Sequence, residues 1–459
     1  MSSSIFKDVG SYKMDGFHLT INTDNSMETL TPEENQTLIH EYTHFLQSIS
    51  TVYGWYRISN LAIITQHLVH GIYQKDDGSF IRQFPFFNPS GKDGELIESA
   101  MSLNTMLEGS NGEECNINII NQSPGFYFVH DVKSECFSKH PDFDEDMMEL
   151  PAGATLSKNI RVTYLFDPTG QKQDNPNKID VMLGAVCIYE FMAYAIEKHV
   201  SEKNFILPQV PYFVVKDVTE FILEMEVDDK IIACLCEFSL QSRSPGETFY
   251  NLLIGLKKQE FDYNILTPEL MGKMFNARHI IETDDGSISY SPIELLHKYA
   301  DETLEEYKTL FSSFEDYKSI TDLLSHINDA VNIYRNGDLY MISKLLFKTP
   351  KEAISEITEI MRTVGIPPIF NNSGYIGHAI SDHSYDQYYL FLPMLSEFVH
   401  FTLKGNFRCE LLETCQKYSP EVINDKCHSN VYLKGKDDLL CGVGQIIKMW
   451  KLNDYTFTQ

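Results

Sequence analysis

The chain has 459 residues, of which 43% are hydrophobic and 22% are charged, as in ordinary globular proteins with a large core. Its formal net charge is −28 and its Lys and Arg residues form no cluster, which argues against nucleic acid and anionic membranes as partners. The N-terminus lacks the apolar segment of a signal peptide, and no run of about 18 apolar residues occurs. We therefore expect a cytoplasmic protein.

The nine cysteines are irregularly spaced, and in a cytoplasmic protein we expect them to be reduced thiols. Cys409, Cys415, Cys427 and His428 could together form a structural zinc site. Their spacing lacks the paired C-x-x-C turns that are typical of such sites. The sequence therefore favours buried free cysteines.

The first predicted elements are a short strand and a capped helix. Residues 16–22 are rich in β-forming residues and end in a turn-forming segment. Thr31, Pro32 and Glu34 then form a capping box with proline at the first helical position. Apolar residues recur at helical spacing from 38 to 49, which predicts a helix that Gly54 interrupts and a second helix over about 58–73.

The middle of the chain mixes both kinds of element. We predict a helix over 95–108, and strands over 115–121, 125–132 and 159–166, with an acidic loop at 142–149. Residues 179–200 read as one long apolar helix, and residues 201–212, which contain two prolines, read as a linker.

The remainder is predicted to be nearly all helical. Ser244, Thr267, Ser291 and Thr349 each precede a proline and mark helix starts. Residues 367–385 read as a loop rich in Gly, Asn and His, and residues 388–403 as an apolar helix. The predicted fold class is α+β and predominantly helical. A region over 1–200, with a β-rich insertion at about 113–170, would carry the chemistry, and a helical lobe over 201–459 would complete the cleft.

One motif on the first helix carries chemistry. Residues 40–44 read His-Glu-Tyr-Thr-His, so His40 and His44 lie one turn apart on the same helical face and can bind one Zn²⁺. Glu41 is rotated by about 100° around the helix axis, so it can miss the metal and still reach a water molecule bound to it. The sequence therefore predicts Glu41 as the general base of a metal-assisted hydrolysis.

With this motif the chain resembles the zincin metallopeptidases. No histidine follows His44 at the metzincin spacing, which leaves the gluzincin pattern, where a glutamate on a second helix is the third ligand. Glu190 is the only charged residue between 181 and 196, and the small Ala193 at i+3 would let its helix approach the motif helix closely. Glu190 is therefore the favoured ligand, Glu108 is the alternative, and an ion pair of Glu190 with Arg or Lys remains open.

The resemblance also implies an oxyanion-stabilising side chain and a place for the substrate. Residues 374–385 offer Tyr375, His378, His383 and Tyr385, although an ordinary surface loop is an equal alternative. Glu197 could orient a histidine ligand, but we favour a solvated position for it. Most zincins have a large β-sheet before the motif helix. Here only about 30 residues precede that helix, which is too few for such a sheet. The β-rich insertion could then supply the edge strand that holds an extended peptide.

The predicted function is a cytoplasmic zinc-dependent endopeptidase with a protein or peptide substrate, and the acidic charge favours a basic one. Two alternatives stay open. One is a catalytically inactive zincin-fold protein that binds a partner, and the other is a zinc hydrolase of a non-peptide amide.

Overall fold

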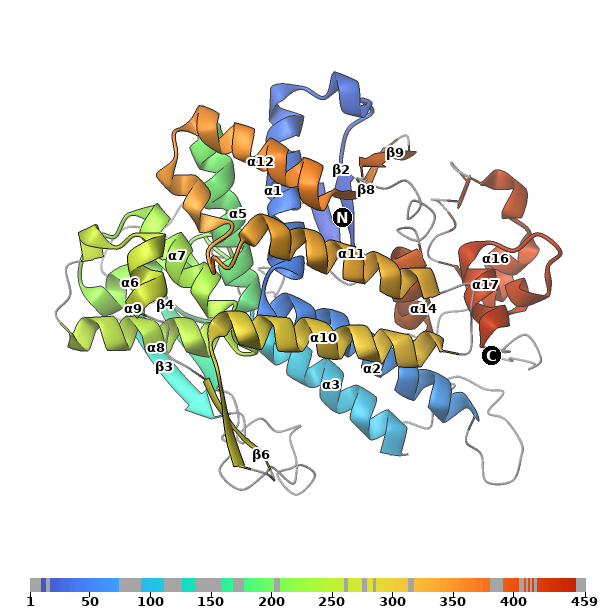
Figure 1. Cartoon of the computed structure of the whole chain (residues 1–459), viewed down its shortest axis with the longest axis horizontal. Helices are drawn as coiled ribbons and strands as arrows, with labels where there is room; N and C mark the ends of the chain where they lie inside the picture. Colours follow the sequence, from blue (N-terminus) through green and yellow to red (C-terminus); the bar gives the residue numbers. More distant parts are fainter. Residues whose placement is uncertain are drawn as a thin grey trace.

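A computed structural model describes residues 10–13, 17–73, 92–110, 126–136, 158–167, 177–201, 207–259, 263–274, 279–283, 286–312, 318–372, 374–379, 391–403, 408–409, 412, 415–416 and 419–450. Across these residues the fold is predominantly helical with small sheets (Figure 1), which confirms the predicted fold class at this level. None of the helices in the described residues is both long and apolar enough to cross a membrane.

Strands from both ends of the chain form one sheet of order β1-β2-β8-β9. Its strands are β1 (Gly10–Lys13), β2 (His18–Ile21), β8 (Ile366–Asn371) and β9 (Gly374–Ala379), and β2 pairs with β8 in parallel. The prediction of a loop over 367–385 is therefore wrong up to residue 379. Pro367 and Pro368 favoured a loop in the sequence analysis, because proline is rare inside strands. Both lie in an irregularity of the β8–β9 register, where their missing N–H groups cost no ladder bond.

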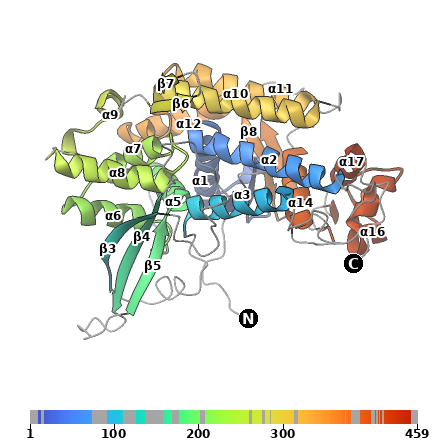
Figure 2. The same ribbon diagram turned by 90° about the horizontal axis from the view of Figure 1, so that it is seen from below.

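The motif helix α1 (Pro32–Ile49) is followed closely by α2 (Val52–Tyr73). The helix breaks at Ser50 rather than at Gly54, which lies inside α2. A Cβ atom on Gly54 would lie 2.0 Å from the carbonyl oxygen of Ser48, so glycine permits this tight turn between the helices. α3 (Lys92–Glu108) and α10 (Pro292–Phe311) both pack on α2 (Figure 2).

A second antiparallel sheet consists of β3 (Phe126–Cys136), β4 (Lys158–Asp167) and β5 (Asn177–Leu183), followed by α5 (Ala185–Val200). The prediction of one helix over 179–200 is wrong up to residue 184, because α5 begins at Ala185. Lys178 and Asp180 are exposed while Ile179 and Val181 are buried, and this alternation is that of a strand. Strands β3 and β4, which belong to the predicted β-rich insertion, contact α6 (Val214–Leu223) and α8 (Pro245–Lys258). The motif helix α1 contacts strand β1, which was not part of that insertion.

The predicted helix starts are confirmed, because prolines open α8, α9 (Pro268–Met274), α10 and α12 (Pro350–Val364). Other elements are α7 (Asp229–Ser239), α11 (Lys318–Arg335), α14 (Phe391–Leu403) and the β6–β7 hairpin (His279–Thr283, Gly286–Tyr290). One apolar core includes residues from both predicted regions, 1–200 and 201–459, among them Phe45 and Leu235. The predicted strand 115–121 and acidic loop 142–149 lie outside the described residues.

Candidate metal centre

The motif helix begins as its sequence predicts. The Thr31 side chain accepts a hydrogen bond from the Glu34 backbone N–H, and the Glu34 carboxylate accepts one from the Thr31 N–H at 2.7 Å. This reciprocal cap fixes the start of α1. Eight residues later the helix enters the core, where His40, Glu41 and His44 are all less than 9% exposed.

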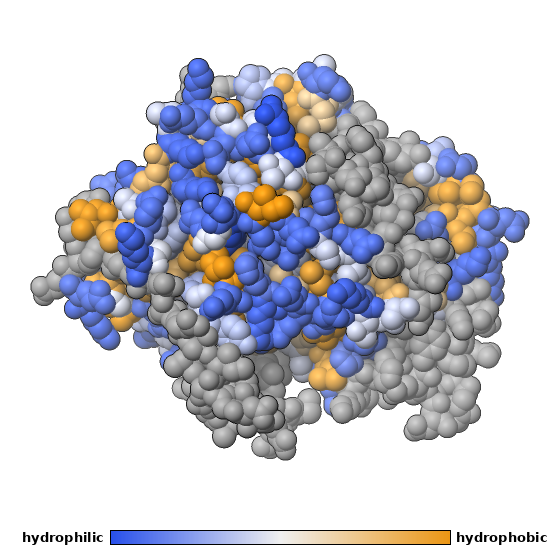
Figure 3. All heavy atoms as spheres, viewed as in Figure 1, coloured by the Kyte–Doolittle hydropathy of each residue, from blue (hydrophilic) through white to orange (hydrophobic). Residues whose placement is uncertain are grey.

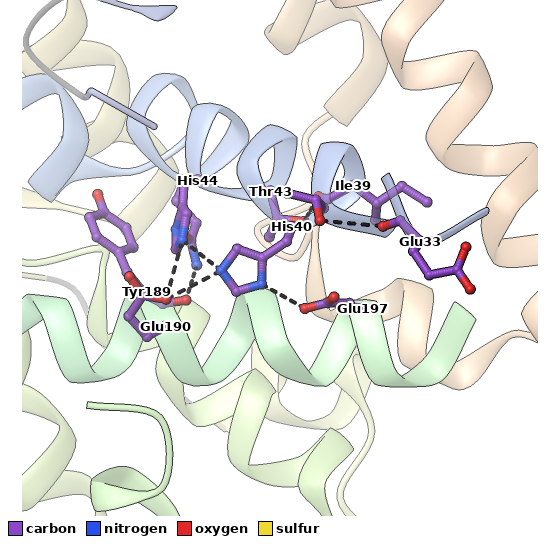
Figure 4. A network of polar contacts seen from close by, with 10 residues as sticks. Glu33, Ile39, His40, Thr43, His44, Tyr189, Glu190 and Glu197 are labelled. Carbon is purple, nitrogen blue, oxygen red and sulfur yellow. Dashed lines mark hydrogen bonds and ion pairs between the residues drawn. The ribbon is translucent and has the colours of Figure 1, made fainter. Parts of the chain in front are cut away.

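Helix α5 lies against α1 and brings Glu190 to the two histidines (Figure 4). The Glu190 Oε2 atom lies 3.2 Å from His40 Nε2 and 3.5 Å from His44 Nε2, and the two Nε2 atoms are 3.2 Å apart. Ligands at about 2.0–2.1 Å from one tetrahedral ion are separated by about 3.3 Å, so this spacing fits a bound divalent metal. Among the described residues, no other group of His, Cys, Asp and Glu brings three ligand atoms within 4.8 Å.

The far ring nitrogen of each histidine has its own acceptor. His40 Nδ1 lies 2.9 Å from Glu197 Oε2, and His44 Nδ1 lies 2.8 Å from Gln47 Oε1. Gln47 is in turn held by the backbone carbonyl of Tyr189, to which its amide donates at 3.2 Å. When Nδ1 donates to these acceptors, the Nε2 lone pair is left free to bind a metal.

The preferred prediction for Glu197 is therefore wrong, because this side chain is buried and bonded rather than solvated. Its position seven residues after Glu190 places both carboxylates on one face of α5, two turns apart. Gln47 was missed, although it follows His44 by three residues on the same helix.

Electrostatics at the centre favour a positive charge. Burial alone would lower the pKa of His40, but hydrogen bonds with Glu190 and Glu197 outweigh it and raise that pKa well above its usual range. Burial would likewise raise the pKa of Glu190, yet His44 and His40 hold it well below its usual value. The carboxylates thus stabilise a proton on His40, and a cation can take the same place.

Glu41 is buried beside strand β1, and its charge interacts with those of His40, His44 and Glu190. A Cβ atom on Gly10 of β1 would lie 2.5 Å from Thr37 Cγ2 and 2.9 Å from Glu41 Oε1, so glycine lets the strand lie close to this part of α1. Burial raises the pKa of Glu41 to about 7, against the opposing effect of His40 and His44. A carboxylate with this pKa can both take up and release a proton near neutral pH.

Tyr212 is a further residue at the centre that the sequence analysis missed. Its ring centroid lies 6.2 Å from that of His40, and its hydroxyl is hydrogen-bonded to Glu190. Burial, followed by the charges of Glu190 and Glu41, raises the pKa of Tyr212 above its usual range, so the phenol stays a proton donor. Because residue 212 ends a segment predicted as a linker, no local pattern pointed to it.

The remaining candidates lie elsewhere or outside the described residues. Glu108 ends α3, and its carboxylate lies 2.5 Å from Arg57 Nη1 rather than with the histidines. His378 belongs to strand β9, but its side chain is not described, and His383 and Tyr385 lie outside the described residues. Their role at an oxyanion site stays a prediction.

No protein-family model, curated protein or solved structure matches this chain. Its function is therefore argued from the chemistry of the site.

Proposed function

We propose that the chain is a zinc-dependent endopeptidase of the gluzincin type. The observation that carries this proposal is the convergence of His40 Nε2, His44 Nε2 and Glu190 Oε2, while both Nδ1 atoms are engaged by acceptors. Such an arrangement would suit a catalytic zinc ion, because three protein ligands would leave one position for water. None of the seven described cysteines forms a disulfide, which accords with the cytoplasmic setting that we expect.

The three ligands would hold the zinc ion, and Glu197 and Gln47 would fix the orientation of the two imidazoles. When bound, zinc lowers the pKa of a water molecule to about 7 and polarises a carbonyl group. Because Glu190 is 24% exposed whereas the histidine side chains are about 10% exposed, substrate would enter from the Glu190 side.

Glu41 performs the proton transfers in this mechanism. It accepts a proton from the water that attacks the scissile carbonyl carbon, and then gives that proton to the nitrogen of the leaving amine as the C–N bond breaks. Its pKa of about 7 suits both steps.

Tyr212 would donate its phenolic hydrogen bond to the carbonyl oxygen as negative charge develops there. In the present structure that hydrogen bond goes to Glu190, so the hydroxyl already lies at the ligand group. An extended peptide would pair with β1, the outer strand of its sheet, whose Tyr12 ring stacks 6.5 Å from that of His44.

The test combines Glu41→Gln with metal analysis and cleavage of a mixed peptide library. We expect Glu41→Gln to lower the cleavage rate by about 10²–10⁴-fold while zinc content stays near one ion at this centre. Glu190→Ala should lose that ion, whereas the matched variant Glu108→Ala should keep it.

Full activity of Glu41→Gln would overturn the mechanism. Loss of zinc in Glu108→Ala but not in Glu190→Ala would overturn the ligand assignment. A wild-type protein that binds zinc and cleaves no peptide would instead favour a binding protein or a hydrolase of another amide.

A further inference from the structure

The last described part of the chain is built from short elements. After α14 come η9 (Pro420–Val422), α16 (Asp425–Ser429), η10 (Val431–Lys436) and α17 (Gly442–Met449), none longer than eight residues (Figure 1). They lie at one end of the molecule, where α17 packs on α14 and Trp450 contacts Phe398 with ring centroids 5.2 Å apart. Small irregular regions of this kind often need a covalent or metal crosslink to be stable.

Four of the seven described cysteines meet in this region. Cys409, Cys415, Cys427 and Cys441 line one cavity of about 30 Å³, and none of the four forms a disulfide. His428, the fourth member of the zinc site weighed from sequence, is exposed and does not line the cavity. Cys441 takes its place, although it lies 14 residues after Cys427 and no short motif joins the two.

Polar groups around the cavity suit thiolate sulfur. The Gly444 backbone N–H donates to Cys441 Sγ at 3.4 Å, and Cys441 is the N-cap of α17, where the helix dipole favours negative charge. Hydrogen bonds from backbone N–H groups to the sulfur atoms accompany metal-bound thiolates as outer-shell partners.

A buried cation also lines the cavity. The Lys434 side chain is 1% exposed, and its ammonium donates to the Val422 carbonyl at 2.6 Å and to Asp437. Lys426, whose side chain is 33% exposed, pairs with the same Asp437, so this group of two lysines and one aspartate has a net positive charge near the cavity. A negative group in the cavity would be stabilised by that charge.

Neutral thiols do not provide that negative charge. Thiols are neutral, and coordination of a metal ion converts them to thiolates. Four thiolates around a divalent ion carry a net charge of about −2, which the neighbouring ammonium groups partly neutralise.

We propose that Cys409, Cys415, Cys427 and Cys441 bind one structural Zn²⁺ ion through four thiolates. Each thiol releases its proton to solvent when it coordinates, and no redox step occurs. In this structure no three of the sulfurs lie within 4.8 Å of one another, so they must move inward onto the cavity to bind at about 2.3 Å. The site is distinct from the candidate catalytic centre and does not depend on its function.

The first experiment measures zinc in full-length protein. We expect Cys427→Ser and Cys441→Ser to lower the zinc content by about one ion per chain. The matched variant Cys234→Ser, which changes a buried thiol of α7, should leave it unchanged. The double variant His40→Ala/His44→Ala should retain the structural ion, so failure of either zinc proposal is recognised separately. Unchanged zinc in both cavity variants would overturn the structural site.

The second experiment keeps all cysteines and so does not depend on the folding of a cysteine variant. The double histidine variant is loaded with Co²⁺, and four thiolate ligands should produce strong sulfur-to-cobalt charge-transfer absorption. A thiol-binding mercurial should abolish this absorption and, in the zinc-loaded variant, release about one Zn²⁺ per chain. Absence of the absorption, a disulfide among the four cysteines in the intact-mass spectrum, or iron in place of zinc would overturn the proposal.

Discussion

The two histidines of the candidate centre are oriented before any metal binds. Glu197 and Gln47 hold the Nδ1 atoms, so both Nε2 atoms face Glu190, with 3.2 Å between them. Two imidazole nitrogens at this distance are stabilised by a proton or a cation between them. The raised pKa of His40 is consistent with this, because it means that the folded protein holds a proton there tightly. A divalent ion satisfies both nitrogens and the carboxylate at once, with little rearrangement of the three side chains.

Tyr212→Phe tests the residue that is assigned to the oxyanion. Removing one hydrogen-bond donor from such a site costs about 10²–10³-fold in kcat, and we expect a loss of this size with KM and zinc content nearly unchanged. Steady-state kinetics and metal analysis measure both. Tyr53→Phe is the control, because Tyr53 is buried and its hydroxyl has no hydrogen-bond partner among the described residues. A zinc loss in Tyr212→Phe would show that the phenol supports the ligands instead.

The sequence was sufficient to predict the three ligands, because each of them lies in a recognisable local pattern. The two histidines share a motif, and Glu190 is a lone charge in an apolar helix. Glu197 lies near the charged end of that helix and looks like any solvated residue. Its contact depends on how α1 crosses α5, which helical periodicity does not define.

Among the secondary-structure elements, the sequence predicted helix starts more accurately than strand boundaries. Proline after Ser or Thr identifies a helix start within a few residues, and this pattern located α1, α8, α9, α10 and α12. Strand β5 was read as part of α5 because both are apolar, and a run of seven residues is too short for its period to be decisive.

Asp217→Asn tests how helix α6 is tied to the β3–β5 sheet. Asp217 accepts hydrogen bonds from the Tyr164 hydroxyl of β4, at 2.8 Å, and from Gln209. Burial nevertheless raises the pKa of Asp217 from 3.8 to about 6. The folded state therefore holds this proton more tightly than the unfolded state, and stability falls as pH rises from about 4 to about 6. Asparagine keeps an acceptor oxygen and removes the charge.

We expect Asp217→Asn to be more stable than wild type above about pH 6, by an amount approaching about 3 kcal/mol. The advantage should widen by about 1 kcal/mol between about pH 5.5 and pH 8 in urea unfolding. Asp229→Asn should show the opposite sign, because Lys216 and Lys198 outweigh burial and lower the pKa of Asp229. Equal pH dependence of the three proteins would refute the assignment.

For the whole molecule, the sheet beside the motif helix joins residues more than 300 positions apart. β2 pairs with β8 through Leu19–Ile369 and Thr20–Phe370. Periodicity and capping report only on neighbours along the chain, so such a pairing carries no signal in a single sequence. Strands β8 and β9 of the C-terminal half thus extend the β1–β2 pair that precedes the motif helix.

The net charge of −28 gives a prediction about substrates for the molecule as a whole. Hydrophilic residues cover much of the described surface in Figure 3, and with 65 acidic against 37 basic residues in the chain its field should attract cations. If the chain is an endopeptidase, kcat/KM for a lysine-rich peptide should fall roughly tenfold when salt rises from about 20 to about 300 mM. For a matched glutamate-rich peptide around the same cleavage site it should rise, because salt screens repulsion. Identical salt dependence for both peptides would mean that recognition is local to the cleft and that the overall charge does not select the substrate.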